Sequence, residues 1–516
     1  MEEKPILVMQ NITKRFPGVL ANDDVTFNLR EGEIHALLGE NGAGKTTLMN
    51  ILYGLYQPDA GSIFIKGEEK TITSPRRAIE LGIGMVHQHF ALIEPHTVLE
   101  NIVLGQNESW KPGLDMKSAR KKLEAMVEEY GLSIDPDAKV WQLSVGEKQR
   151  VEIIKALYRD VRILILDEPT SVLTEQEADD LFDILKMMTA KGLSIIFISH
   201  KLKEVTQASD RVTVLRKGHV EATVETKGMS KDELARLMVG RNVLFDFEQE
   251  QVEQGVPVLE VTEISARNDK GLPALRHLTL EVREGEILGI AGVAGNGQKE
   301  LAGVIAGLKE IEAGKITLDG TDISNYSPKK RMKAGVGFVP EDRNETGLMK
   351  GFPVKDNLIL RSFNEKQFCS RGFLRHGQIV SYCRKLVEEY DIKTPSLETR
   401  TSTLSGGNLQ KVILARELSG ELKFLLAAQP TQGLDVGAAE FVRQKLLEQR
   451  QRGVGVLLIS EDLDEILQIS DRVAVIYEGQ IMGCLTIQEA KEARSKLGLM
   501  MTGSRLEEIA QVEERI

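Results

Sequence analysis

At 516 residues the chain is too long for one ordinary hydrophobic core, and its length favours two to four domains. A hydrophobic content of 41% with 28% charged residues is ordinary for a water-soluble protein, and the net charge of −11 argues against broad binding to nucleic acid. The three cysteines lack metal-like spacing, no apolar run could cross a bilayer and the start has no signal-peptide pattern. We therefore expect the chain to stay in the reducing compartment where it is made.

The first half alternates strand patterns with helix patterns. A β-rich start at 5–16 is followed by "IHALLG" (34–39), a short apolar run typical of a buried strand, then by a glycine-rich turn and a helix. Two more apolar runs, "RILILDEP" (162–169) and "SIIFISH" (194–200), flank a helical segment at 175–192. This alternation predicts an α/β fold.

The second half repeats the first. "LREGEIHALLGENGAGKTTL" (29–48) aligns with "VREGEILGIAGVAGNGQKEL" (282–301) at an offset of 253, and "LSVGEKQRVEI" (143–153) aligns with "LSGGNLQKVIL" (404–414) at an offset of 261. The halves thus differ by a net insertion of eight residues between these landmarks. A register held over so many landmarks indicates an internal duplication.

A phosphate-binding pattern follows the first buried strand. "GENGAGKT" fits G-x-x-x-x-G-K-[ST] between a strand and a helix, so its backbone N–H groups can cradle phosphates. Lys45 can reach the β- and γ-phosphates, and Thr46 can offer a hydroxyl to Mg²⁺. The predicted nucleotide-binding residues here are Gly39, Glu40, Asn41, Gly42, Ala43, Gly44, Lys45, Thr46 and Thr47. The expected cofactors are ATP and Mg²⁺.

Two adjacent acids end a later strand of the same half. Asp167 is placed to hold Mg²⁺, and Glu168 to position or deprotonate the attacking water. An acidic pair at a strand end can also be a solvated turn, but a phosphate loop in the same domain favours the catalytic interpretation.

The motifs "LSVGEKQ" and "LSGGNLQ", together with the phosphate loop, resemble the signature of the ATP-binding-cassette (ABC) superfamily. The resemblance implies two tandem P-loop cassettes, each with a mostly parallel core sheet, an antiparallel β part and a small helical subdomain. It also implies that Gln88 touches Mg²⁺ and senses a membrane partner. By the same resemblance His200 contacts the γ-phosphate, and Phe16 stacks on adenine.

The second half departs from the family pattern at each catalytic position. Gln298 replaces the phosphate-loop lysine, and Lys299 sits where the Mg²⁺-binding hydroxyl belongs, one position away and therefore on another side of the helix. The residues of this degenerate second site are Gly292, Gly295, Gly297, Gln298, Lys299, Glu341, Ala428, Gln429 and Glu461. No aromatic residue occurs between 261 and 292, so the adenine platform is missing as well.

The signatures depart in the opposite sense. The second half keeps Ser405, Gly406 and Gly407, followed later by Asp435, whereas the first has Val145 and Thr174 at two of the matching positions. In the family, two cassettes face each other, and each ATP lies between one phosphate loop and the opposite signature. Under that arrangement the orthodox residues of both halves fall in one composite site. We expect that site to hydrolyse ATP, and the other to bind nucleotide weakly, to hold it without turnover or to act as a fixed clamp.

The resemblance also implies what the cassettes drive. Closest are importers of the simple-sugar type, and "VHQHFALIEPHTVLENIVLG" and "AAQPTQGLDVGAAEFV" look most like the nucleoside-import branch, with ribose and galactose importers as the alternative. The expected partners are two membrane permease subunits, docking near the segments after Gln88 and Glu341, and indirectly a solute-binding lipoprotein. The chain would lie on the cytoplasmic face of the membrane.

A soluble tandem cassette acting on ribosomes or DNA is the competing class. Its members carry long charged linkers and two competent sites, or zinc-binding cysteine clusters, and this chain has neither. The predicted boundaries are a first cassette at 1–245, a linker at 246–257, a second cassette at 258–505 and a charged tail at 506–516.

Overall fold

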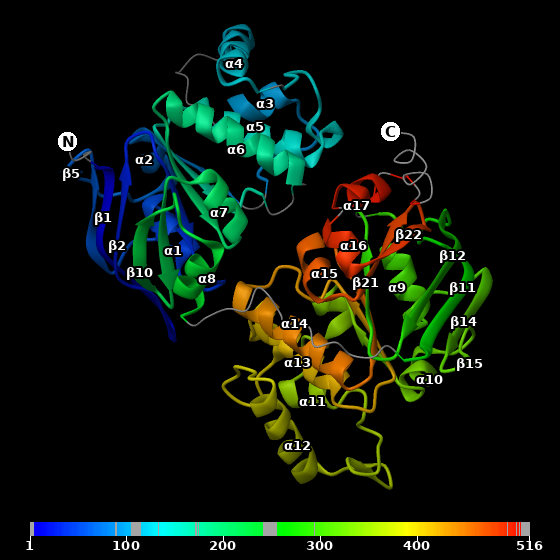
Figure 1. The fold of residues 1–516 in the computed structure, drawn as a ribbon. Helices are drawn as coiled ribbons and strands as arrows, with labels where there is room; N and C mark the ends of the chain where they lie inside the picture. Colours follow the sequence, from blue (N-terminus) through cyan, green and yellow to red (C-terminus); the bar gives the residue numbers. More distant parts are fainter. Residues whose placement is uncertain are drawn as a thin grey trace. The chain divides into compact units, whose positions relative to one another are not determined.

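The computed structural model divides the chain into two compact units, Met1–Val243 and Leu244–Ile516. It describes residues 5–87, 90–104, 115–132, 134–170, 173, 175–240, 255–293, 295–492, 494–501, 503–504 and 506. Most of the predicted linker, nearly all of the predicted tail, Gln88 and Thr174 lie outside these residues. Each unit is described here by itself (Figure 1).

The first unit contains two sheets. The four-stranded sheet runs in the order β2 (Val19–Arg30), β1 (Pro5–Phe16), β4 (Ala60–Ile65), β5 (Glu68–Glu69). The six-stranded sheet runs in the order β10 (His219–Glu225), β9 (Arg211–Arg216), β3 (Ile34–Leu38), β8 (Ser194–Ser199), β7 (Ile163–Asp167), β6 (Ile83–Val86). The four-stranded sheet is antiparallel, and the larger one is parallel except for the β9–β10 pair.

Helices cover these sheets. They are α1 (Lys45–Leu52), α2 (Pro75–Glu80), α3 (Val98–Val103), α4 (Met116–Tyr130), α5 (Val145–Leu157), α6 (Glu175–Ala190), α7 (Leu202–Ala208) and α8 (Lys231–Val239), with a 3₁₀ turn at Val140–Gln142. In Figure 1, α3, α4 and α5 gather to one side of the first unit's sheets, where they form its helical subdomain.

The second unit repeats both sheets. Its four-stranded sheet is β12 (Pro273–Arg283), β11 (Pro257–Arg267), β14 (Ala313–Leu318), β15 (Thr321–Asp322), and its six-stranded sheet is β16 (Val336–Val339), β19 (Phe424–Ala428), β20 (Gly455–Ile459), β13 (Ile287–Ala291), β21 (Arg472–Tyr477), β22 (Gln480–Thr486). A short hairpin pairs β17 (Cys369–Ser370) with β18 (Phe373–Leu374). Read from β6 and from β16, the strand order of the two larger sheets is the same, as a duplication requires.

The helices of the second unit follow the same plan. They are α9 (Gln298–Ala306), α10 (Pro328–Lys333), α11 (Val354–Leu358), α12 (His376–Glu389), α13 (Gly406–Leu418), α14 (Val436–Gln451), α15 (Leu463–Ile469), α16 (Ile487–Glu492) and α17 (Arg494–Met501), with short helical turns at Arg343–Gly347 and Thr401–Thr403. A β-bridge joins Pro353 to Arg400 where the first unit joins Thr97 to Lys139. The offset between the halves is 253 at Glu341, 256 at Pro353 and 261 at Arg400, so the extra residues lie both before Pro353 and between Pro353 and Arg400.

The central strands explain why the phosphate loops lie where they do. Every residue of β3, β7, β8 and their counterparts β13, β19 and β20 is buried, because both faces of the parallel sheet are covered. The loops that follow the carboxyl ends of neighbouring parallel strands meet at one edge, which is where such folds bind ligands. Among the described residues, no helix has the length and apolarity needed to span a bilayer.

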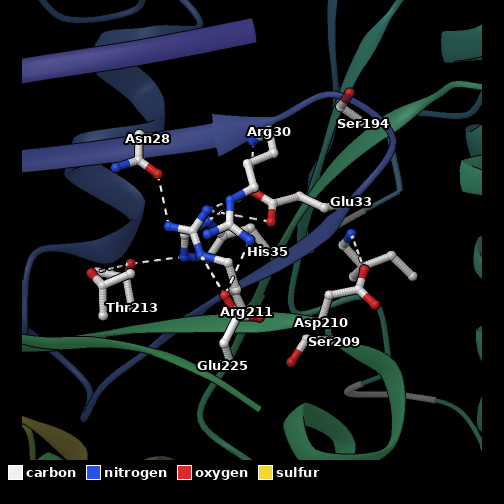
Figure 2. Close-up of polar contacts among 12 residues, drawn as sticks. Asn28, Arg30, Glu33, His35, Ser194, Ser209, Asp210, Arg211, Thr213 and Glu225 are labelled. Carbon is white, nitrogen blue, oxygen red and sulfur yellow. Dashed lines mark hydrogen bonds and ion pairs between the residues drawn. The ribbon is translucent and has the colours of Figure 1, made fainter. Parts of the chain in front are cut away.

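A buried polar cluster packs between the two sheets of the first unit (Figure 2). His35 is fully buried on β3, its Nε2 lies 2.8 Å from the Thr213 hydroxyl, and its ring lies 4.7 Å from that of Phe27. Arg211 reaches Glu33 at 3.2 Å and Asn28 at 2.7 Å. Burial lowers the pKa of His35, although the Glu33 carboxylate opposes the shift.

The second unit has a cavity at the same place. Strand register matches Phe27 to Leu280, His35 to Leu288 and Thr213 to Ala474. A cavity of about 310 Å³, open to the surface, has these three residues and Cys484 in its lining, and Cys484 stands where the first unit has Thr223. In the first unit the Phe27 ring and the hydrogen-bonded hydroxyls of Thr213 and Thr223 fill this space, and the second unit has Leu280, Ala474 and Cys484 at these positions. The two halves therefore differ in packing as well as in their loops.

Candidate nucleotide site

The phosphate loop of the first unit connects β3 to α1. Gly42 and Gly44 have φ angles of 83° and 102°, which ordinary residues rarely adopt. A Cβ on Gly44 would also lie 2.3 Å from the carbonyl oxygen of Ala21. The loop thus turns its backbone inward at the N-terminus of α1, where N–H groups and the helix dipole favour an anion.

Lys45 lies over this loop. Its side chain is 5% exposed, and its ammonium donates to the carbonyl oxygens of Gly39 at 2.7 Å and Glu40 at 3.0 Å. The charge is held close to the loop backbone, so the loop and the lysine together form a cationic cradle suited to an anion. Thr46, the next residue, hydrogen-bonds the carboxylate of Asp167.

The acidic pair ends β7 beside this cradle. Burial raises the pKa of Asp167 to about 6, and the neighbouring Glu168 charge adds to the shift, while Lys45 and Thr46 oppose it. Asp167 is thus a buried carboxylate beside a second negative charge, a position that a bound cation would stabilise. A hydroxyl and a carboxylate in this position are ligands that Mg²⁺ prefers, so the residues fit that ion.

His200 meets Glu168 across the ends of β7 and β8. Its Nδ1 lies 2.8 Å from Oε1 of Glu168, and this hydrogen bond is the main cause that lowers the pKa of the carboxyl group. Glu168 has a φ of 47°, and its N–H donates to the Ile198 carbonyl oxygen at 3.1 Å. The structure thus brings the predicted base and the predicted γ-phosphate sensor into direct contact, with the base in a strained backbone conformation.

The second unit keeps the shape of the site without its chemistry. Gly295 and Gly297 have φ angles of 89° and 105°, close to those of Gly42 and Gly44. Gln298 occupies the lysine position, is buried, and donates to the carbonyl oxygen of Val293 at 3.1 Å. The predicted displacement of the cation is visible here, because Lys299 is exposed and lies 3.8 Å from Asp269.

The strand-end residues show the same loss. Gln429 has the φ of Glu168, 47°, and its side-chain oxygen accepts from the backbone N–H of Glu461 at 3.2 Å. Ala428, the preceding residue, has no carboxylate. Burial raises the pKa of Glu461, and the nearby Glu341 charge raises it further. Where the first unit offers a lysine and a histidine, the second offers an amide and two acids.

The signature residues begin α13 and α14. Ser405 precedes α13 without capping it, and its hydroxyl accepts from Nδ2 of Asn408 at 2.9 Å. The matching Ser144 forms a capping box with Glu147 at the start of α5. Asp435 caps α14 by accepting from the N–H of Ala438 at 2.8 Å, a structural role that the sequence interpretation did not include.

Phe16, the predicted adenine platform, ends β1. Its ring is 36% exposed, packs edge-on against Tyr56 at 5.4 Å and lies 5.7 Å from the ammonium of Lys14. The exposed ring face can accept a base. Gln88 and Thr174 lie outside the described residues, so the structure gives no position for them.

Sequence reasoning missed a buried carboxylate behind this site. Glu204 on α7 accepts hydrogen bonds from the hydroxyls of Thr170 and Ser199. A signal was available, because Thr431, Ser460 and Glu465 repeat these three residues at the offset of 261 while the catalytic positions around them change.

Comparison with known proteins places both halves in one family. A family model described as "ABC transporter" matches residues 22–171 and 275–432. The glucose import ATP-binding protein TsgD13 of Haloferax volcanii is 49% identical over 98% of this chain and 96% of its own length. The guanosine import ATP-binding protein NupO of Bacillus subtilis is 48% identical over 97% and 98%, and the nucleoside import ATP-binding protein NupA of Lactococcus lactis is 46% identical over 98% and 100%.

Proposed function

The chain belongs to the ABC transporter family, and we propose that it couples ATP hydrolysis to the import of nucleosides through separate membrane permease subunits. It is an ATPase, as the ATP-binding proteins of this family are. The observation that carries the proposal is the contact between Glu168 and His200, 2.8 Å, beside a lysine-bearing phosphate loop. Such a contact supports hydrolysis and not nucleotide binding alone.

The first unit holds the groups that hydrolysis needs. The loop N–H groups and Lys45 would bind the β- and γ-phosphates, and Thr46 and Asp167 would hold Mg²⁺, which when bound neutralises phosphate charge. Glu168 would orient the attacking water and take its proton, because its depressed pKa keeps the carboxylate ionised at neutral pH. His200 holds that carboxylate and would contact the γ-phosphate.

We infer that the second unit completes this site instead of forming its own. Ser405, Gly406 and Gly407 at the start of α13, together with Asp435, would contact the ATP held by the first unit. Support comes from the way the substitutions divide: the second unit lost lysine, carboxylate and histidine but kept the signature, while the first has Val145 in its signature. Random decay would not sort the changes in this way.

The other composite site would not turn over. Gln298 supplies no charge, Ala428 supplies no metal ligand, and Glu461 with Glu341 places negative charge where the γ-phosphate would lie. Repulsion from two acids disfavours a magnesium–triphosphate complex that the lysine of the first unit would attract. This site is therefore proposed to be a structural clamp that does not hydrolyse ATP.

We propose that exposed apolar residues form the surface on which the permeases dock. In the first unit Ile93 and Trp141 are exposed on neighbouring segments, joined by the hydrogen bond from the Trp141 N–H to the Glu94 carbonyl oxygen. In the second unit, after Glu341, Met349 and Phe352 are exposed. Two such surfaces suit two permease subunits, each inserting a short helix. Docking there would hold the chain at the cytoplasmic face of the membrane.

Nucleosides are proposed as the solutes because two relatives are named as guanosine and nucleoside import proteins, and this chain matches both over nearly their whole length. The glucose-import relative, at 49% identity, makes a sugar the alternative. A soluble role on ribosomes or DNA is less well supported, since all three relatives are import proteins.

Uptake by a reconstituted transporter tests the proposal. This chain would be reconstituted in ATP-containing vesicles with the permeases and the binding lipoprotein encoded by neighbouring genes. Uptake of labelled guanosine would then be compared with uptake of glucose and ribose. We expect guanosine uptake that requires ATP and is lost in Glu168→Gln. Uptake of a sugar alone would overturn the nucleoside assignment, and co-fractionation of the chain with ribosomes in place of permeases would overturn the import assignment.

A further inference from the structure

A buried carboxylate joins the two segments that carry Glu168 and His200. Glu204, on the first turn of α7, is 8% exposed. Its Oε1 accepts from the Thr170 hydroxyl at 2.5 Å, and its Oε2 accepts from the Ser199 hydroxyl at 2.8 Å. Thr170 lies two residues after Glu168, and Ser199 immediately precedes His200. The Glu204 side chain therefore links the segment after β7 to the end of β8.

Further contacts hold the His200 segment on its other side. The Lys201 N–H donates to the Ser199 hydroxyl at 3.0 Å, and the Lys201 ammonium lies 3.1 Å from Oε1 of Glu204. The same ammonium reaches the Thr170 carbonyl oxygen at 3.4 Å. His200 is thus placed between two residues that are both tied to Glu204, which fixes its backbone beside Glu168.

The two hydrogen bonds that Glu204 accepts from Thr170 and Ser199 form a bridge, and the backbone conformation at Glu168 indicates what this bridge does. A φ of 47° at a residue with a full side chain is strained, and such conformations persist only where the surroundings hold them. The hydrogen bond from Thr170 to Glu204 anchors the chain just beyond the strained residue. Without it, the carboxylate of Glu168 would be free to move away from its position beside His200.

The second unit contains the same bridge without the catalytic residues. Ser460 donates to Glu465 at 2.7 Å, Thr431 also hydrogen-bonds Glu465, and Gln429 shares the φ of 47°. Glu465 is fully buried. Asp462 stands where the first unit has Lys201, and the cation beside Glu465 is instead Arg443, whose Nε lies 3.5 Å from Oε1 of Glu465. The bridge therefore shapes this pair of loops wherever they occur, and only in the first unit do the loops carry a base.

We propose that Glu204 is a positioning residue for hydrolysis, which holds Glu168 and His200 in register by tying Thr170 to Ser199. The inference rests on the proposed catalytic role of Glu168. The contacts of Glu204 described above go to Thr170, Ser199 and Lys201, so it acts on the placement of the base and not on nucleotide binding.

Steady-state ATP hydrolysis by the full-length chain tests the proposal. In Glu204→Ala we expect kcat to fall about 10- to 100-fold, the range expected when a catalytic group is misplaced by about 1 Å. KM for ATP should change little, because Lys45 and the loop are untouched. Glu204→Gln should restore most of kcat, since an amide can accept from one hydroxyl and donate to the other.

Two further variants make the outcome decisive. Thr170→Val removes one arm of the bridge at constant volume, and it should lower kcat in the same sense; combined with Glu204→Ala it should add little, because both act through one contact. Thr170→Val also serves if Glu204→Ala does not fold. Glu465→Ala is the matched control, which should lower the melting temperature as Glu204→Ala does but leave kcat nearly unchanged.

Failure of the inference can be told from failure of the proposed function. If Glu168→Gln stops hydrolysis while Glu204→Ala and Thr170→Val keep kcat, the bridge does not position the base. Equal losses of kcat in Glu204→Ala and Glu465→Ala would show a general effect on folding and would equally overturn the proposal. If Glu168→Gln itself retains full turnover, the proposed catalytic assignment fails first.

Discussion

Nδ1 of His200 lies 2.8 Å from Oε1 of Glu168, and the corresponding pair in the second unit has become Glu461 and Gln429. The backbone at the two strand ends is unchanged, with φ of 47° at both Glu168 and Gln429. Within one chain the same loop geometry therefore occurs once with a base and its partner, and once without either. The matching positions of the second unit, Gln429 and Gln298, therefore serve as controls for substitutions at Glu168 and Lys45.

Glu168→Gln should reduce ATP turnover about 10²- to 10⁴-fold, because an amide cannot take the proton of the attacking water. Phosphate release at saturating ATP measures the effect. Gln429→Ala, the change at the matching position of the second unit, should leave turnover nearly intact. A comparable loss in both variants would contradict the assignment of hydrolysis to the first phosphate loop.

Lys45→Ala should weaken ATP binding about 10- to 100-fold, since a charge-assisted hydrogen bond to phosphate is worth about 1.5–3 kcal/mol. Gln298→Ala should have little effect on the high-affinity binding. Calorimetric titration with Mg²⁺ and ATP on the Glu168→Gln background separates binding from hydrolysis. Equal weakening by the two substitutions would mean that both loops bind ATP with similar strength.

The first unit should lose stability as the pH falls, through His35. Burial holds its pKa below the ordinary value of about 6.5, so the unfolded chain binds the proton more readily. Stability from neutral His35 is then fully present above about pH 6.5 and is lost as the pH falls toward the folded-state pKa. The neighbouring charges that face the ring are Glu33 and Arg211.

Thermal unfolding of wild type and His35→Gln between pH 7.5 and 5 checks this. The variant should show a smaller drop in melting temperature, although it is less stable at neutral pH. His277→Gln, at an exposed histidine on β12, is the control and should keep the wild-type pH dependence. An unchanged slope in His35→Gln would exclude this histidine as a cause.

Filling the cavity of the second unit should stabilise that unit. Leu280→Phe restores the ring that the first unit has at Phe27, and cavity-filling changes commonly add about 0.5–2 kcal/mol. The reverse change, Phe27→Leu, removes packing against His35 and should destabilise the first unit by about 1 kcal/mol or more. Urea unfolding measures both. Destabilisation by Leu280→Phe would show that the residues lining the cavity cannot move to make room for the larger ring.

Patterns that depend on neighbours in the chain could be predicted from the sequence. The phosphate loop, the strand-end acids and the duplication are local or periodic signals, and the division of substitutions between the halves follows from alignment alone. The outward position of Lys299 also follows from helix geometry and is seen in its approach to Asp269. The places of the eight extra residues could not be predicted, because two loops absorb them, one before Pro353 and one between Pro353 and Arg400.

By itself, the sequence determined which chemical groups the chain has and which half has lost them, since composition and spacing are properties of the chain. The tertiary structure decided which groups touch. Glu204 reaches Thr170 across 34 residues, Asp435 caps the helix that follows it, and the space filled by Phe27 and Thr213 in one unit is a cavity in the other. These outcomes depend on packing between distant segments and on backbone strain at Glu168, and neither has a period or spacing that a sequence pattern can express.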